Sequence, residues 1–169
     1  MDALTAHGDP VDTAWRIHSA LIDWTGKVDT KASFALTIES AAFAGIVAFA
    51  TSSNGLKWTH SYWPLVSFRF GMGCLGLAVL LSAAAVIPQI RGGHATRNWR
   101  ENFIYFGHLR KWNPEKLAKA LKETDILPML ARQHVVMSKI AWRKHRLLQA
   151  SMLIAVLGIA LVFVPGLNG

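Results

Sequence analysis

Three long apolar runs stand out from an otherwise polar chain. Ala32–Thr51 has Glu39 as its only charge, Leu65–Ile87 has only Arg69, and Leu147–Val164 carries no charge at all. A membrane-spanning helix needs about 17–25 predominantly apolar residues, so each run is long enough to cross a bilayer. The pattern predicts an all-α membrane protein with three transmembrane helices at residues 32–51, 65–87 and 147–164.

The remaining segments complete the predicted organisation of the chain. They are a cytoplasmic N-terminal helix at 1–31, an outer loop at 52–64, a cytoplasmic basic helical crown at 88–146 and a tail at 165–169.

Capping residues and helix breakers predict the helices outside the apolar runs. Asp9-Pro10 and Asn113-Pro114 each place a capping side chain before a proline at the first helical position, a strong helix start. The segment Glu101–Trp112 is predicted to form a short helix. Neither glycine nor proline occurs between Pro128 and Gly158, which predicts one long helix that continues into the third run.

Charge is distributed very unevenly along the chain. Residues 88–146 hold 13 of the 18 Lys and Arg but only four of the ten acidic residues, a balance of +9, against −1 elsewhere. Basic loops stay on the cytoplasmic side of a membrane, so the N-terminus and residues 88–146 are predicted to face the cytoplasm. Such a concentration of positive charge also favours a polyanionic ligand.

We expect a nucleotide or nucleic-acid ligand to bind this basic region. Lys and Arg side chains next to aromatic rings such as Tyr105, Trp112 and Trp142 suit phosphate contact combined with base stacking. The alternative is that these bases bind anionic lipid headgroups, the role assigned to Lys144 and Arg146 beside the third run. The predicted ligand-binding residues are Arg97, Arg100, Arg110, Lys111, Lys116, Lys119, Lys122, Arg132 and Lys139.

The first apolar run carries small and polar residues at helical spacing. An acidic side chain inside a bilayer is costly and usually faces protein or water, which makes Glu39 a functional candidate. A pore lining shared by several subunits would explain the stripe, since three helices of one subunit cannot enclose an aqueous path; cyclic symmetry is expected, and a tetramer is our prediction. Tight helix packing, with hydroxyls bonded back to their own helix, is the alternative. The predicted pore-lining residues are Ser33, Thr37, Ser40, Ala44, Ala48 and Glu39.

Motifs for catalysis or cofactor binding give no coherent site. Gly71–Gly76 fits the dinucleotide pattern G-x-G-x-x-G, but it lies inside an apolar run with no preceding strand. Small residues that let helices approach closely explain it better. The sequence contains no H-x-x-x-H, C-x-x-C, G-x-S-x-G or P-loop pattern. We therefore expect no enzymatic activity, no cofactor and no metal.

A series of short motifs resembles the Pycsar-effector transmembrane family. The residues Asp29, Lys31, Ala32 and Ser33, just before the first run, are similar to the family pattern A-D-x-K-A-S. Pro88 then closes the second run, and an aromatic cluster follows at 103–106. The helix start at 113–115 and the stretch 133–144 complete the order, so the resemblance covers about residues 13–164.

This resemblance implies a membrane effector of bacterial anti-phage defence in the inner membrane. Such effectors are controlled by a nucleotide signal from a partner nucleotidyltransferase or cyclase. Many carry an appended cyclic-nucleotide-binding domain; none is recognised in this sequence, so we expect the stand-alone form, which resembles Hailong-type effectors controlled by a single-stranded DNA oligomer.

The expected function is thus a pore-forming effector gated by a nucleotide or a single-stranded DNA oligomer. A cyclic-nucleotide-responsive membrane-disrupting effector remains an alternative within the same family. Two further alternatives belong to other classes: a lipid-binding structural membrane protein, and a small transporter in which Glu39 would be a proton or cation site.

Overall fold

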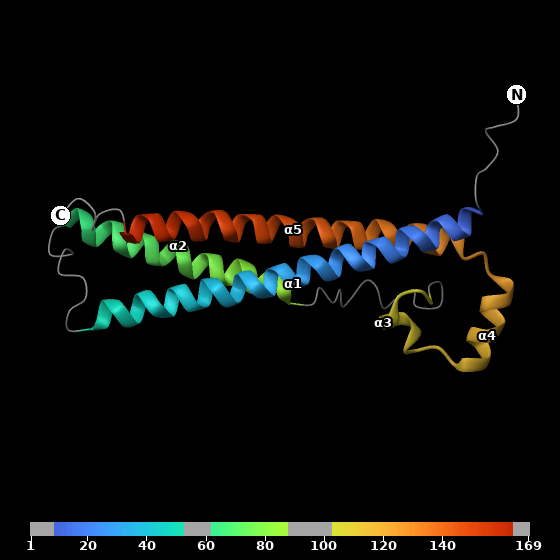
Figure 1. The fold of residues 1–169 in the computed structure, drawn as a ribbon. Helices are drawn as coiled ribbons and strands as arrows, with labels where there is room; N and C mark the ends of the chain where they lie inside the picture. Colours follow the sequence, from blue (N-terminus) through green and yellow to red (C-terminus); the bar gives the residue numbers. More distant parts are fainter. Residues whose placement is uncertain (1–8, 53–61, 88–102, 164–169) are drawn as a thin grey trace, which may run out of the picture. The chain divides into compact units, whose positions relative to one another are not determined.

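The computed structural model describes residues 9–52, 62–87 and 103–163, and these ranges are helical without any strand. The all-α prediction is therefore confirmed. Three of the helices are long and apolar enough to cross a membrane: α1, α2 and α5. Figure 1 shows the five helices in chain order, α1 (Pro10–Thr51), α2 (Tyr62–Val86), α3 (Phe106–Leu109), α4 (Pro114–Glu123) and α5 (Leu127–Phe163).

Helix α1 is one continuous helix of 42 residues. It begins at the predicted cap, where the backbone N–H of Val11 donates to Asp9 Oδ1 at 2.9 Å. Gly26 lies within the helix and does not interrupt it. At about 1.5 Å per residue α1 is roughly 63 Å long, twice the apolar thickness of a bilayer. The first apolar run and the polar segment before it therefore form a single element.

Helix α5 has the same construction, because a polar first half continues without a break into the third apolar run. The side chain of Asp125 accepts from the Leu127 N–H at 3.0 Å, just before the helix starts. Helix α4 begins as predicted, with Pro114 at its first position and Asn113 Oδ1 accepting from Glu115 N–H at 2.9 Å. The predicted helix start at 113 and the long helix after 127 are both confirmed.

The predicted helix Glu101–Trp112 is wrong in extent. In the described part of that segment only Phe106–Leu109 is helical, and isolated turns follow it. The residue before the helix, Tyr105, supplies no side-chain hydrogen bond to its first turn. Aromatic residues and Gly107 also have low helix propensity. Without a side-chain cap or a favourable composition, the segment does not sustain more than one turn.

The chain divides into two compact units; α1 and α5 contribute to both, and α2 belongs to one. We call residues 27–88 and 142–169 the membrane unit. We call residues 1–26 and 89–141 the basic unit, which holds α3, α4 and the first part of α5.

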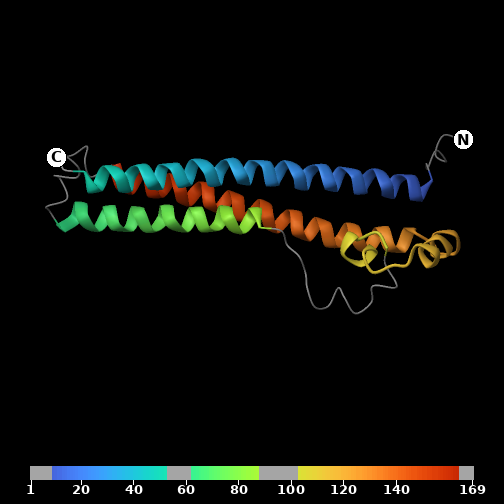
Figure 2. The same cartoon turned by 90° about the horizontal axis from the view of Figure 1, so that it is seen from below.

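In the membrane unit three helices pack through a seven-residue repeat. Buried positions in α2 alternate in steps of four and three: Gly71, Leu75, Ala78, Ser82 and Ala85. The buried residues of α5 follow the same rule, from Lys144 through Leu148 to Val162. Steps of four and three define the heptad of coiled-coil packing. The three helices run side by side in this unit (Figure 2).

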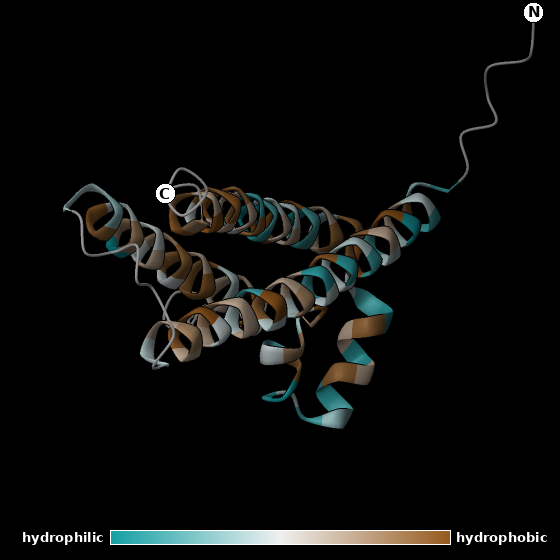
Figure 3. Ribbon diagram, turned by 60° about the vertical axis from the view of Figure 1, so that its left-hand side comes forward, coloured by the Kyte–Doolittle hydropathy of each residue, from teal (hydrophilic) through white to brown (hydrophobic). Residues whose placement is uncertain are grey.

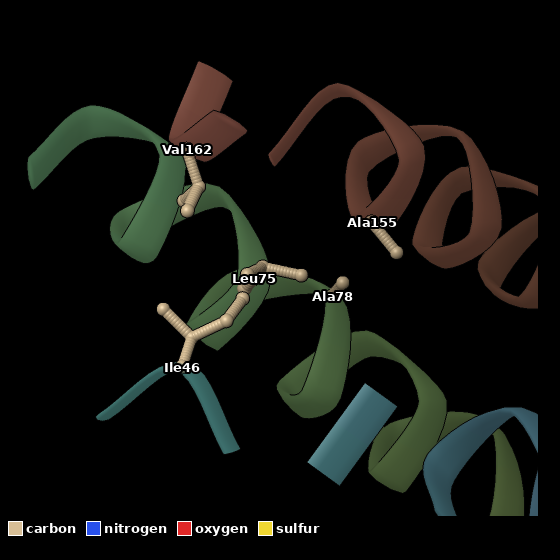
Figure 4. Close-up of a cluster of buried hydrophobic side chains, with 5 residues drawn as sticks. All are labelled: Ile46, Leu75, Ala78, Ala155 and Val162. Carbon is tan, nitrogen blue, oxygen red and sulfur yellow. The ribbon is translucent and has the colours of Figure 1, made fainter. Parts of the chain in front are cut away.

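Two apolar clusters form the core of the membrane unit. One contains Val28, Ala32, Ala85 and Leu148. The other contains Ile46, Leu75, Ala78, Ala155 and Val162, and Figure 4 shows that all three helices contribute to it. The interior is therefore filled by side chains. Any aqueous path would have to lie outside this three-helix core.

Helices α2 and α5 cross with their backbones in close contact. A Cβ atom on Gly71 would lie 2.8 Å from the carbonyl oxygen of Gly158, and one on Gly158 would lie 2.9 Å from that of Gly71. A Cβ on Gly73, by contrast, would meet nothing within 4 Å. Gly71 therefore serves helix packing, as predicted for the glycine pattern, and no dinucleotide fold surrounds it in the described chain.

The outer surface of the membrane unit is strongly apolar. Large side chains such as Phe34, Phe70 and Leu153 are about two-thirds exposed. Figure 3 shows α2 hydrophobic along most of its length, whereas α4 has a mixture of polar and apolar positions. A surface of this kind is stable in lipid and not in water.

Candidate functional site: a buried polar cluster and an exposed basic surface

A carboxylate lies in the interior of the membrane unit, between the two apolar clusters. Glu39 of α1 is only 5% exposed, and Ser82 of α2 and Ser151 of α5 are fully buried. Ser82 Oγ lies 2.7 Å from Glu39 Oε2, and Ser151 Oγ lies 3.0 Å from Glu39 Oε1. The two serine oxygens are also 2.7 Å apart. Each of the three helices thus contributes one side chain to a single hydrogen-bonded cluster.

The heptad explains why these side chains meet. Ser82 and Ser151 occupy inward positions in the repeats of α2 and α5, where apolar residues fill the neighbouring layers. Glu39 occupies the equivalent position in α1, seven residues before Ile46 and seven after Ala32. A polar residue inside such a seam needs partners in the same layer. Here every polar side-chain atom of the cluster has one.

A second polar contact, partly buried, joins α1 and α5 in the same unit. Lys144 Nζ donates to Asp29 Oδ1 at 2.5 Å, and the side chains are 6% and 41% exposed respectively. The sequence interpretation of Lys144 as a lipid contact is therefore wrong, because the ammonium group points into the unit. Its position in the heptad, four residues before Leu148, directs it inward. Asp29 of the family motif therefore holds α1 to α5 by pairing with Lys144.

The other motif residues divide between the interior and the surface. Ala32 is fully buried in the apolar cluster beside Leu148. Lys31 and Ser33 are exposed.

The predicted pore-lining residues separate into two groups in the structure. Glu39 faces the interior, whereas the other five are exposed on α1: Ser33, Thr37, Ser40, Ala44 and Ala48.

The hydroxyls of the exposed group are partly occupied by their own helix. Ser33 Oγ donates to the carbonyl of Asp29, and Thr37 Oγ1 to that of Ser33, both at 3.0 Å. These bonds to the helix backbone satisfy the hydroxyl hydrogens of Ser33 and Thr37 without water. Their hydroxyl oxygens can still accept hydrogen bonds. The small and polar stripe is thus separated from Glu39 and left uncovered by α2 and α5.

The Lys and Arg side chains of the basic unit that the structure describes are exposed. Three of them, Lys116, Lys119 and Lys122, follow at intervals of three on one face of α4, whereas Leu117 and Ala120 are half-buried. Arg97 and Arg100 lie outside the described residues. The other predicted ligand-binding residues are exposed: Arg110, Lys111, Lys116, Lys119, Lys122, Arg132 and Lys139.

Aromatic rings in the basic unit contact one another. Phe103 meets Trp112 edge to face with centroids 5.9 Å apart, and Tyr105 meets His108 in the same way at 5.2 Å. Tyr105 and Trp112 are half-buried in these contacts, while Trp142, in the membrane unit, is 68% exposed. Tyr105 and Trp112 therefore support the local fold around α3 before any contact with a ligand.

A histidine pair lies where α1 and α5 meet in the basic unit. The ring centroids of His18 and His134 are 5.7 Å apart. Burial lowers the pKa of His18, and the neighbouring His134 lowers it further by like-charge repulsion. This pair favours neutral imidazole at His18 in the folded protein.

Sequence reasoning missed the partners of Glu39 and Asp29 and the histidine pair. These contacts leave a trace in the sequence, because their polar residues occupy heptad positions of the helices: His18, Ser82, His134, Lys144 and Ser151. Each lies three or four residues from a buried or half-buried neighbour on the same helix. No group of three or more metal-ligating side chains occurs within residues 9–52, 62–87 and 103–163.

These features define a small helical membrane protein with an internally bonded polar core and an exposed basic region. The chain belongs to the Pycsar effector family, because the Pycsar effector protein domain (PycTM) matches residues 13–167. No curated protein and no solved structure matches the chain. The resemblance seen in the sequence motifs is therefore confirmed.

Family membership makes the chain a membrane effector of anti-phage defence. It also implies a cyclic nucleotide signal from a partner cyclase and association with the membrane.

Proposed function

We propose that this chain forms an oligomeric ion channel in the bacterial inner membrane, gated by a nucleotide polyanion bound to its basic cytoplasmic region. The role is non-enzymatic. The observation that carries the channel proposal is the uncovered stripe Ser33, Thr37, Ser40, Ala44 and Ala48 on α1. The apolar interior of the subunit is filled by side chains, so ions would pass between subunits and along a surface of this kind.

The two exposed flanks of α1 differ in a way that supports this arrangement. The small and polar stripe occupies one flank of the membrane half. Large apolar residues occupy the other: Phe34 is 66%, Ile38 67% and Phe49 54% exposed. In a symmetric ring of subunits, the apolar flank would face lipid or a neighbouring subunit. The polar flank would face the axis, where water can reach the hydroxyl oxygens.

The charge distribution supports the proposed topology and ligand. Residues 88–146 carry a balance of +9, so the N-terminus and this region would face the cytoplasm. Exposed Lys and Arg attract phosphates of either a cyclic nucleotide or a short single-stranded DNA oligomer made by a partner nucleotidyltransferase or cyclase. Because each phosphate contact releases counterions, salt dependence distinguishes a many-phosphate ligand from a single one.

The test is ion flux from liposomes that contain the purified protein. We expect Ala44→Leu to reduce flux at least tenfold, because the larger side chain enters the proposed path. Gly45→Leu is the matched control: it adds similar bulk one residue away, where an added Cβ meets nothing within 4 Å, on the apolar flank. Equal flux from both variants would show that α1 does not line the path.

Ligand addition separates this proposal from the alternatives. A change of flux upon adding a DNA oligomer or a cyclic nucleotide supports the gated channel and identifies which of the two acts. Binding to anionic vesicles without flux or nucleotide binding would favour a lipid-binding structural protein. Flux that requires a proton gradient would favour a transporter.

A further inference from the structure

We infer that Glu39 is a proton-binding site: in the packed membrane unit its side chain is a neutral carboxylic acid that donates to Ser82. The inference comes from counting protons in the cluster, and it does not depend on channel activity. Three oxygen–oxygen contacts link the side chains of Glu39, Ser82 and Ser151, at 2.7, 2.7 and 3.0 Å. Distances in this range are those of O–H···O hydrogen bonds, and each such bond needs one proton.

The two serine hydroxyls supply only two protons for these three contacts. With an ionised carboxylate, either the Ser82–Ser151 contact or one contact to Glu39 would hold two oxygens together without a hydrogen. Oxygen lone pairs that face each other at such a distance repel. Ser151 Oγ also lies 3.2 Å from the carbonyl oxygen of Leu148, which is a further acceptor and supplies no proton. An ionised Glu39 therefore leaves the cluster short of hydrogens.

A protonated Glu39 satisfies all three contacts in a closed ring. Its Oε2–H donates to Ser82 Oγ, the Ser82 hydroxyl donates to Ser151 Oγ, and the Ser151 hydroxyl donates to Glu39 Oε1. Every polar atom of the three side chains is then paired, as buried polar groups require. The ring needs one side chain from each helix. The bound proton and the packing of α1, α2 and α5 therefore support each other.

Among the described residues, no cationic side chain bonds Glu39 to favour the ionised form. Apolar clusters flank Glu39 on both sides, with Ala32, Ala85 and Leu148 on one and Ile46 and Ala78 on the other. The charged side chains that face into the described part of the unit are Asp29 on α1 and Lys144 on α5. They bond each other about two to three turns from the cluster, and the inward positions of α2 carry no ionisable residue.

Loss of the proton would place an unpaired charge in an apolar interior, which strongly opposes close packing of the three helices. A carboxylate would instead favour an arrangement in which water reaches it. A glutamine amide at position 39 would supply the same donor and acceptor as the carboxylic acid and would carry no charge.

Infrared spectroscopy tests the proton directly in the purified protein, without any flux. We expect a carboxylic acid carbonyl band, shifted by exchange into D₂O, that is present in the parent near neutral pH and absent from Glu39→Gln. Ser82→Ala should move this band, because it removes the acceptor of the acid proton. Ser67→Ala is the matched control, since Ser67 Oγ donates to the Leu161 carbonyl at 2.7 Å in the same unit and does not touch Glu39.

The inference is overturned if the parent shows no such band, or if the band persists in Glu39→Gln. A Glu39→Gln protein that loses its helical circular dichroism would also contradict it, because glutamine should complete the same ring. If the infrared result holds while ion flux is absent, the proton site stands and the channel proposal fails.

Discussion

The membrane unit and the basic unit differ in where their charged side chains lie. In the membrane unit each charged or polar side chain at an inward position has a partner in the same unit: Glu39 with Ser82 and Ser151, and Lys144 with Asp29. In the basic unit the lysines of α4 are exposed. Where water is absent, partners must come from the protein. The comparison separates residues that hold the subunit together from residues that a polyanion can reach.

The largest effect is expected from breaking the Asp29–Lys144 pair. Asp29→Ala should destabilise the protein by about 3 kcal/mol, because it leaves the Lys144 ammonium buried without a partner. Lys144→Met should cost only about 1 kcal/mol, since the half-exposed Asp29 carboxylate is partly hydrated. Unfolding by detergent titration, followed by circular dichroism, measures both values.

The double variant Asp29→Ala/Lys144→Met sharpens this test. It should recover most of the stability lost in Asp29→Ala, because no buried charge remains. Additive losses would mean that the pair contributes nothing as a pair.

The next effect concerns the contact between α2 and α5. Gly71→Val should cost roughly 1–3 kcal/mol, because even a Cβ at this position would lie 2.8 Å from the Gly158 carbonyl oxygen. Gly73→Val is the control in the same helix, where the added atom meets nothing within 4 Å. Equal losses of stability in the two variants, measured by the same detergent titration, would contradict the close crossing.

A smaller effect is expected on ligand binding by the basic unit. Lys119→Glu with Arg132→Glu should weaken binding of a single-stranded DNA oligomer and reduce its salt slope by about 1.4, for two lost phosphate contacts. Arg146→Glu, an exposed base of the membrane unit, is the control and should change neither value. Fluorescence anisotropy at several salt concentrations measures both. An unchanged slope in the double variant would remove these residues from the site.

The smallest effect concerns the histidine pair. Because the folded protein lowers the pKa of His18, the unfolded chain binds a proton more readily there. Stability should therefore be unaffected above the ordinary pKa of about 6.5 and should fall as the pH drops below it. His18→Gln should flatten this decline, as measured by thermal unfolding between pH 5 and 8. The same decline in both proteins would assign it to other groups.

The sequence predicts the helices of this fold better than their contacts. The apolar runs, the Asn113 cap and the lack of breakers after Pro128 led directly to α1, α2, α4 and α5. The predicted helix around α3 is too long, because aromatic residues make the segment resemble an apolar helix face. Their low helix propensity and the missing side-chain cap limit the helix to one turn.

The polar pairings in the interior depend on three helices meeting in register. Polarity and spacing identified Glu39 as unusual, but grouped it with Ser40 and Ala44 on the neighbouring face. A strict heptad would have separated them: Glu39 is seven residues from both Ala32 and Ile46, which are buried. Small residues such as Ala32 and Ala78 conceal that repeat, because they give little hydrophobic contrast. Which serines complete the cluster follows only from tertiary packing.

The most direct test of the proposed channel is ligand-dependent flux through the reconstituted protein. Ion flux is recorded from liposomes with and without a nucleotide ligand, for the parent, Lys119→Glu/Arg132→Glu and Arg146→Glu. The proposal predicts that the ligand changes flux in the parent and in Arg146→Glu, and that the double variant conducts without responding. Flux that is absent in every protein, or that responds equally in all three, would contradict a channel gated through the basic unit.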